Sequence, residues 1–207
     1  MSYGFSRRGF RGAVQPDIPN RQAPYTWAAL IQETIRYPAF AYGTGPTARQ
    51  EAAAFLANVS HETGGLVYAR EQNPGPNFCD PSAPCPLGPA AYYGRGSLML
   101  SWNYNYAAAS NDFNFDVLNN PDLVATDELL VWRVGLWYWM TVNAAAAQTC
   151  HQAMELSLGF GQTILCINGG LECGPNAQNP GAMHDRVNLY TQFCGILGVD
   201  PGTNLTC

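Results

Sequence analysis

The chain has 207 residues, of which 47% are hydrophobic and only 12% are charged. This composition excludes a disordered or fibrous chain, and the length suffices for one domain with a sizeable core, or for one domain with two lobes. All ten basic residues are arginine and the net charge is −5, so we expect neither nucleic acid nor a membrane surface as a partner. An uncharged or cationic polymer fits this charge balance better.

The N-terminal stretch differs in composition from the rest. Residues 1–16 are rich in Gly, Arg and Ser and contain no apolar run of the kind that a signal peptide needs. We expect these residues to form a flexible tail or linker and residues 17–207 to form the folded domain. The longest apolar segment, Leu129–Met140, is interrupted by Arg133 and is too short to span a bilayer.

The cysteine pattern indicates an oxidising compartment. Seven cysteines in a chain of this length suggest disulfides and therefore a secreted protein, although the odd number leaves at least one thiol free. No two cysteines form a CxxC pair and only three histidines are present. We therefore expect no metal site and no cofactor.

The first half of the chain predicts two helices. Thr26 is placed to cap a helix over Trp27–Arg36, which Pro38 ends. A second helix is expected to begin at Thr47, where Thr47 and Gln50 match a capping box, and to end at Gly64-Gly65. Its apolar residues recur at helical spacing on one face: Ala52, Phe55, Leu56 and Val59.

Two glutamates at the end of this second helix are candidates for acid and base chemistry. Glu62 continues the apolar face, so we expect it to be partly desolvated, which raises the pKa of a carboxyl group. Glu71 follows nine residues later, across a glycine turn, among the polar residues Arg70 and Gln72. Two carboxylates in unlike environments are what general acid and base catalysis requires, although a glutamate in a last helical turn is more often a solvated residue.

The second half predicts a loop, a small strand region and further helices. We expect Pro74–Ala90 to be a loop, in which Cys79 and Cys85 are close enough to form a disulfide. We expect 91–106 to form a short strand or hairpin, followed by the start of a helix near Ser101. Thr126 is expected to cap the central buried helix, which extends to Thr141. We expect a short helix over His151–Leu158, an apolar run over Ile164–Ile167, a turn at 168–170 and a last helix over Asp185–Leu197. The fold class is mainly α with a small sheet.

Several motifs then resemble one family. The runs FLANVSHETGG, AYYGRG, LSWNYNY, NPDLVATD, WYWMT, INGGLECG and ILGVDPGTNLTC, in this order, resemble the family 19 chitinases, in the loop-poor form of bacterial members. The resemblance covers about residues 19–207. It implies a lysozyme-like, two-lobed helical fold with a substrate cleft, and endo-hydrolysis of β-1,4-linked N-acetylglucosamine polymers with inversion at the anomeric carbon.

The resemblance also implies roles for individual residues. Glu62 matches the general acid, Glu71 the general base and Ser101 a serine that holds the attacking water. The residues that match polar positions around the substrate are His61, Tyr92, Arg95, Asn105, Asn168, Glu172 and Arg186. Among these, Glu172 and Arg186 are expected to form an ion pair that positions the acid and base. The substrate is then chitin or a chitooligosaccharide, and we expect a monomer.

The cysteines match in part, and three positions depart from the family, among them Ala83, where plant members commonly carry a Trp. Cys79–Cys85 and Cys173–Cys207 resemble family disulfides, whereas Cys150 and Cys166 have no counterpart and are free to pair with each other or with Cys194. Ser97 replaces the usual Pro. Met99 replaces a Gln that contacts substrate, which removes a hydrogen bond worth about 1 kcal/mol.

Two other functions stay open at this point. The same fold suits a peptidoglycan-cleaving, lysozyme-like enzyme such as an endolysin, against which the NYNY and INGGLECG motifs and the cysteines count. A non-catalytic chitin-binding defence protein is the other alternative, but both glutamates and Ser101 are present.

Overall fold

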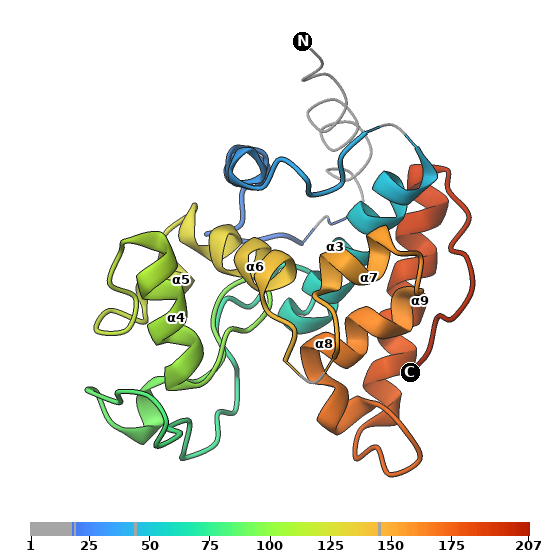
Figure 1. The fold of residues 1–207 in the computed structure, drawn as a ribbon. Helices are drawn as coiled ribbons and strands as arrows, with labels where there is room; N and C mark the ends of the chain where they lie inside the picture. Colours follow the sequence, from blue (N-terminus) through green and yellow to red (C-terminus); the bar gives the residue numbers. More distant parts are fainter. Residues whose placement is uncertain (1–17, 19, 44, 145) are drawn as a thin grey trace. The chain divides into compact units, whose positions relative to one another are not determined.

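Helices and loops make up the computed structural model, which describes residues 18, 20–43, 45–144 and 146–207. The predicted tail, 1–16, lies outside these described residues. The elements, labelled as in Figure 1, are α2 (Trp27–Glu33), η2 (Thr34–Arg36), α3 (Pro46–Thr63), η3 (Pro89–Ala91), α4 (Asn103–Phe113), α5 (Leu123–Thr126), α6 (Leu130–Thr141), α7 (Cys150–Glu155), α8 (Phe160–Glu172) and α9 (Pro180–Leu197). The mainly helical class is confirmed.

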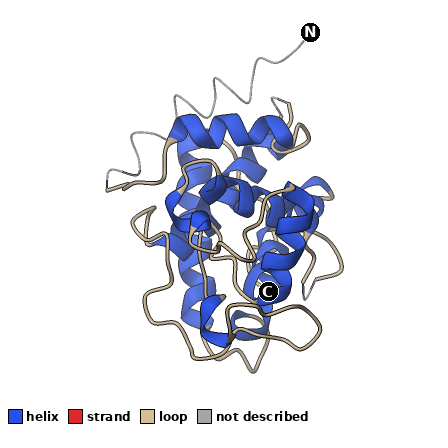
Figure 2. Ribbon diagram, turned by 90° about the vertical axis from the view of Figure 1, so that its left-hand side faces the viewer, coloured by secondary structure: helices blue, strands red, loops and turns tan. Residues whose placement is uncertain are grey.

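The small sheet of the prediction is not present as strands in the described part of the chain, as Figure 2 shows. Two isolated antiparallel bridges stand in its place, Arg70 with Arg95 and Arg95 with Leu100. Arg95 and Leu100 exchange backbone hydrogen bonds of 3.1 and 2.7 Å. The turn between them contains Gly96 and Met99, both at positive φ, so the pairing ends after one residue pair. No helix of the described residues is long and apolar enough to cross a membrane.

The chain divides into two compact units. Unit 1 contains Thr34–His61 and Trp139–Cys207, and unit 2 contains Asn20–Glu33 and Glu62–Tyr138. Helix α3 therefore belongs to unit 1 as far as His61, and only its last turn belongs to unit 2.

The core of unit 1 forms around α3. The four residues of its predicted apolar face are buried, and alanines on the other faces, Ala53, Ala54 and Ala57, are buried as well. Phe55 packs edge-on against Trp139, with ring centroids 5.5 Å apart. Small side chains around the whole helix thus allow close packing on every side, which is what places Glu62 at the end of a rigid element.

The core of unit 2 forms around Trp132 of α6. This side chain is fully buried and its indole N–H donates to the carbonyl of Thr26, at 3.0 Å. Arg133 beside it donates two hydrogen bonds, of 2.8 and 2.9 Å, to the buried carboxylate of Glu33 on α2. The central buried helix of the prediction is confirmed, and Trp137 and Trp139 are core residues.

The helix caps were predicted less well than the helices. Thr26 does cap α2, since its hydroxyl accepts the N–H of Ala29. The capping box at Thr47 is wrong, because α3 begins with Pro46 and the side chain of Gln50 donates to the carbonyl of Asp200. Thr126 is not the cap of α6 either. That role falls to the carboxylate of Asp127, which accepts the N–H groups of Leu129 and Leu130.

Helix α8 corrects a second prediction. The apolar run at 164–167 and the predicted turn at 168–170 both lie within the element Phe160–Glu172, which consists of two helical segments joined by a kink where Asn168 has φ −144° and ψ 32°. Helix α9 likewise begins at Pro180, before the predicted Asp185. The predicted helix at 151–158 corresponds to α7, which Thr149 and Gln152 start with a capping box.

Glu51 of α3 is a buried acid whose oxygens all have partners. It accepts hydrogen bonds from the N–H of Ala41 at 2.7 Å and the indole of Trp139 at 2.9 Å, and His151 Nδ1 lies 2.7 Å from its Oε1. The hydrogen bond to Glu51 raises the pKa of His151. This makes the protonated imidazole a stabilising part of unit 1.

We therefore expect the stability of the protein to fall as the pH rises. A histidine pKa that is higher in the folded state contributes fully below the ordinary histidine pKa of about 6.5, and the contribution is lost as the pH rises through the raised pKa. Urea unfolding of the wild type and of His151→Gln at several pH values measures this. The difference between the two proteins should shrink with increasing pH, and a constant difference would contradict the assignment.

Candidate active site

The two predicted catalytic glutamates both lie in unit 2, in different local settings. Glu62 is half-buried in the last turn of α3, which ends where Gly64 and Gly65 take up positive φ values of 59° and 76°. The hydroxyl of Thr63 accepts the N–H of Leu66 at 2.8 Å. The glycines and this side-chain hydrogen bond end the helix sharply and fix the position of its last residues.

Glu71 is held by backbone pairing with the segment that follows Tyr93. Its N–H donates to the carbonyl of Gly94 at 2.8 Å, and the N–H of Gly94 donates to Glu71 Oε2 at 3.0 Å. The N–H of Gly96 donates to the carbonyl of Ala69. The main chain thus fixes both the backbone and the carboxylate of Glu71, and one carboxylate oxygen keeps a fixed direction.

Arg95 and Tyr92 are buried within unit 2. Arg95 donates to Asp122 Oδ1 at 3.0 Å, to the carbonyls of Ala91 and Tyr93, and to the hydroxyl of Tyr106 at 3.1 Å. Burial raises the pKa of Asp122, but the hydrogen bond and charge of Arg95 outweigh it and hold that pKa below its ordinary value. The hydroxyl of Tyr92 accepts the N–H of Leu87. These contacts hold the 91–106 segment in place.

Ser101 and Asn105 lie at the start of α4. Ser101 is half-buried, and its carbonyl accepts a hydrogen bond of 2.8 Å from the amide of Asn105. Trp102, between them, has a positive φ of 75° and its N–H donates to the carbonyl of Tyr92. Ser101 therefore follows directly after the Arg95–Leu100 bridge and belongs to the same fixed segment that holds Glu71.

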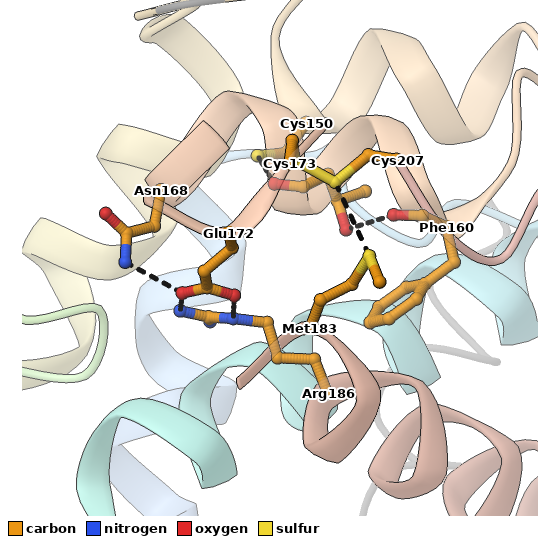
Figure 3. The surroundings of a disulfide bond; sticks show 9 residues. Cys150, Phe160, Asn168, Glu172, Cys173, Met183, Arg186 and Cys207 are labelled. Carbon is orange, nitrogen blue, oxygen red and sulfur yellow. Dashed lines mark hydrogen bonds and ion pairs between the residues drawn. A yellow bond between two sulfur atoms is a disulfide. The ribbon is translucent and has the colours of Figure 1, made fainter. Parts of the chain in front are cut away.

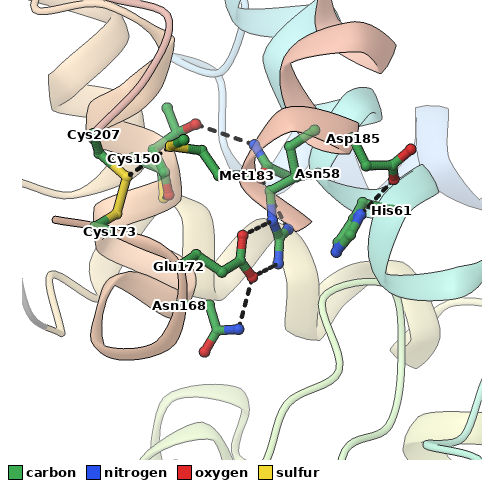
Figure 4. A network of polar contacts seen from close by, with 11 residues as sticks. Asn58, His61, Cys150, Asn168, Glu172, Cys173, Met183, Asp185 and Cys207 are labelled. Atoms are coloured by element: carbon green, nitrogen blue, oxygen red, sulfur yellow. Dashed lines mark hydrogen bonds and ion pairs between the residues drawn. A yellow bond between two sulfur atoms is a disulfide. The ribbon is translucent and has the colours of Figure 1, made fainter. Parts of the chain in front are cut away.

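The other predicted site residues form a polar network in unit 1 (Figures 3 and 4). Arg186 of α9 donates two hydrogen bonds of 2.8 Å to the buried carboxylate of Glu172, and Asn168 donates a third, of 2.7 Å. The expected ion pair between Glu172 and Arg186 is thus present. Burial raises the pKa of Glu172, but the hydrogen bonds and charge of Arg186 outweigh this and lower it.

Two members of this network were not predicted. Arg186 also donates to the amide oxygen of Asn58 at 3.1 Å, and Asn58 in turn donates to Thr163 at 3.1 Å. His61 Nδ1 lies 2.6 Å from the carboxylate of Asp185. Figure 4 shows these two side chains facing each other. Asn58 and Asp185 escaped prediction because their partners are more than 100 positions away in sequence, and no local motif marks such a contact.

Both predicted disulfides are present. Cys79 is bonded to Cys85 and Cys173 to Cys207, and the latter joins the end of α8 to the last residue of the chain. Cys150, Cys166 and Cys194 lie outside these two disulfides, and all three are buried. Among the described residues one group offers three potential metal ligands close together: Glu51, His151 and Glu155. Since the Glu51 oxygens already accept hydrogen bonds, we interpret the group as an ion-pair cluster.

Comparison with known proteins identifies the fold as that of a class of glycoside hydrolases. The family model described as chitinase class I matches residues 15–207. The chain belongs to this family, glycoside hydrolase family 19.

Solved structures and curated sequences agree with this. Chitinase C from Streptomyces griseus has a TM-score of 0.87 and 47% identity, over 96% of this chain and 95% of that one. A bacterial family 19 chitinase has a TM-score of 0.86 and 48% identity, over 96% and 97%. Endochitinase A of Zea mays is 44% identical over 187 residues, which are 88% of this chain and 62% of that protein. The chain thus spans less than two thirds of the length of this curated relative.

Proposed function

We propose that the protein is a secreted, monomeric endochitinase that hydrolyses β-1,4 linkages between N-acetylglucosamine units with inversion. The main observation behind the proposal is that two carboxylates are held in different ways. Glu62 lies at the end of a buried helix, and the carboxylate of Glu71 accepts a hydrogen bond from the N–H of Gly94. Family membership, with relatives named endochitinase, supports it. The two disulfides are typical of an oxidising compartment.

The proposed mechanism divides the work between these carboxylates. Glu62 donates a proton to the oxygen of the leaving sugar. Glu71 takes a proton from a water that attacks the anomeric carbon from the opposite face, and Ser101 holds that water. An inverting glycosidase keeps its two carboxyl groups about 6.5–9.5 Å apart so that the water fits. The site needs no metal or cofactor for these steps.

The remaining residues divide into two proposed roles. Asn105, Asn168 and His61 are half-buried and offer polar groups to the N-acetyl and hydroxyl groups of the sugar chain. Tyr92 and Arg95 are buried, so we propose that they position the 91–106 segment. We retain the expectation that residues 17–207 form the catalytic domain, with the lysozyme-like two-lobed fold and cleft that the resemblance implies.

The ion pair of Glu172 and Arg186 is proposed to act on Glu62 through α3. Arg186 holds Asn58, and Glu62 lies four residues further along the same helix. Positions four apart lie on one face of a helix. The pair therefore anchors the turn of α3 that precedes the proposed acid, which makes Glu172 and Arg186 positioning residues.

A substrate comparison tests the proposed function. The protein is incubated with the N-acetylglucosamine hexamer and, separately, with bacterial peptidoglycan, and soluble products are measured. We expect shorter oligomers from the hexamer and none from peptidoglycan. Release of peptidoglycan fragments alone would favour the lysozyme-like alternative, and binding to chitin without turnover would favour a non-catalytic protein.

Gly94 offers a test of how Glu71 is held. A Cβ at this position would lie 3.3 Å from Glu71 Oε2 and 3.1 Å from Met99 Cβ, so Gly94→Ala should displace the carboxylate by a few tenths of an ångström. We expect kcat on the hexamer to fall by roughly tenfold, because small misplacements of a catalytic group are costly. Gly195→Ala, where a Cβ meets nothing within 4 Å, is the matched control. Equal rates in the two variants would contradict this role.

A further inference from the structure

Three cysteines are not used by the two disulfides. Cys150 is the first residue of α7, Cys166 lies in α8 and Cys194 lies in α9, and all three are buried. The sequence leaves open which of them face one another. The contacts of each sulfur atom indicate which two of the three cysteines lie side by side.

The thiol of Cys150 is directed at α8. Its Sγ lies 3.7 Å from the carbonyl oxygen of Thr163. Thr163 precedes Cys166 by three residues, and residues three apart are neighbours on one helix face. The Cys150 and Cys166 thiols shift each other's pKa, Cys150 upward and Cys166 downward, which agrees with the two sulfurs lying close together. Cys166 Sγ also lies 3.2 Å from the carbonyl of Val142.

Cys194 faces a different group. Burial raises the pKa of its thiol and the hydroxyl of Tyr190, one turn earlier on α9, lowers it, so this thiol lies beside Tyr190. Tyr190 is itself stacked on Phe160, with centroids 4.2 Å apart. Of the three possible pairings, the contacts therefore favour Cys150 with Cys166.

We propose that Cys150 and Cys166 form a third disulfide when the chain folds in an oxidising compartment, and that this bond clamps α7 to α8. The bond would have a local consequence for the polar network of unit 1. Cys166 and Cys173 flank Asn168 and Glu172 in the sequence, and Cys173 is already bonded to Cys207. A bond at Cys166 would therefore leave the segment that carries Asn168 and Glu172 crosslinked on both sides.

The bond forms by two thiol–disulfide exchanges with a low-molecular-weight disulfide such as oxidised glutathione. A thiolate of the chain attacks one sulfur of glutathione disulfide and releases one glutathione thiolate. The second cysteine, as thiolate, attacks the resulting mixed disulfide and releases the other glutathione thiolate. The chain loses two hydrogen atoms and two glutathione thiols are produced. Since both sulfurs are buried in the folded protein, the exchange occurs before α7 packs on α8.

Thiol labelling after refolding tests the proposed bond. The reduced, unfolded chain is refolded in a glutathione redox buffer, then denatured and treated with iodoacetamide, which labels only free thiols. The mass of the chain and of its peptides is then measured. We expect one labelled cysteine, Cys194, and a disulfide-linked peptide pair that contains Cys150 and Cys166. Three labelled cysteines in a chain with Cys79–Cys85 and Cys173–Cys207 fully formed would overturn the proposal. A bond from Cys194 to either partner would overturn it as well.

Variants separate a covalent bond from simple thiol packing. The melting temperature is compared for Cys150→Ala, Cys166→Ala, the double variant and, as a control that keeps the proposed bond, Cys194→Ala. Loss of the bond should lower the melting temperature by roughly 5–10 °C. We expect each single variant of the pair to lose this amount and the double variant to lose little more. Additive losses would show two independent packing residues and would contradict the disulfide.

Discussion

Glu62→Gln should abolish most hydrolysis of the N-acetylglucosamine hexamer. The amide is nearly the same size as the carboxyl group but has no proton to donate to the leaving sugar. Removal of a general acid typically costs about 10²–10⁴-fold in rate, and we expect kcat to fall by this factor while hexamer binding changes little. The variant should fold normally, because Glu62 is only half-buried in the last turn of α3 and the amide fits the same space.

The measurement is steady-state hydrolysis of the hexamer, with binding followed separately by calorimetry. Glu128→Gln is the matched control, because it also replaces a carboxylate by an amide. The Glu128 side chain is exposed, and its carboxylate accepts a hydrogen bond from the hydroxyl of Thr26. The control should retain wild-type kcat. A Glu62→Gln variant that hydrolyses the hexamer within threefold of wild type would show that another group is the acid.

Arg186→Met should cause the largest loss of stability among the polar substitutions in unit 1. It leaves the carboxylate of Glu172 buried without its cation and removes the hydrogen bond to Asn58. Breaking a buried ion pair from one side costs about 3–5 kcal/mol in the free energy of unfolding. Urea denaturation with the midpoint and slope fitted together measures this loss.

A double variant makes this prediction specific. Glu172→Gln together with Arg186→Met removes both charges, so part of the lost stability should return relative to Arg186→Met alone. Such coupling is expected for residues in direct contact. If Arg186→Met lowered the free energy of unfolding by less than about 1 kcal/mol, or if the two substitutions had strictly additive effects, the buried pair of Glu172 and Arg186 would not be an important source of stability.

Local rules predicted helix bodies well because apolar spacing is a property of consecutive residues. The face of Ala52, Phe55, Leu56 and Val59 and the glycine end of α3 are both present. The caps were less predictable, because several side chains compete for one helix start. Pro46 displaced Thr47 as the first residue of α3, and Asp127 displaced Thr126 at α6.

The strand region and α8 show where tertiary contacts outweigh local sequence. Alternation in 91–106 predicted a short strand or hairpin. The buried Arg95 side chain instead donates to two carbonyl groups and two side chains, and the pairing stops at two bridges. The sequence Asn168-Gly169-Gly170 predicted a turn, and the structure has only a kink at Asn168, after which the helix resumes. The side chain of Asn168 donates to Glu172, and a Cβ at Gly169 would lie 2.6 Å from Leu165 Cδ1.

The candidate site was predicted through the family resemblance more than through pattern. Apolar spacing alone marked Glu62, and the glycine turn suggested Glu71. The holding groups were not visible in sequence, since Gly94 acts through its backbone N–H and Asn58 through a contact with Arg186. Such groups have no characteristic residue type, and only the fold brings them to their partners.

The most direct test of the proposed mechanism is the anomeric form of the fresh product. The hexamer is hydrolysed in an NMR tube and the anomeric proton signals are recorded before mutarotation equilibrates them. The proposed mechanism predicts that the α-anomer forms first, because water activated by Glu71 attacks opposite the leaving group. A first product in the β form would mean retention, and would contradict the assignment of Glu71 as a base that acts through water.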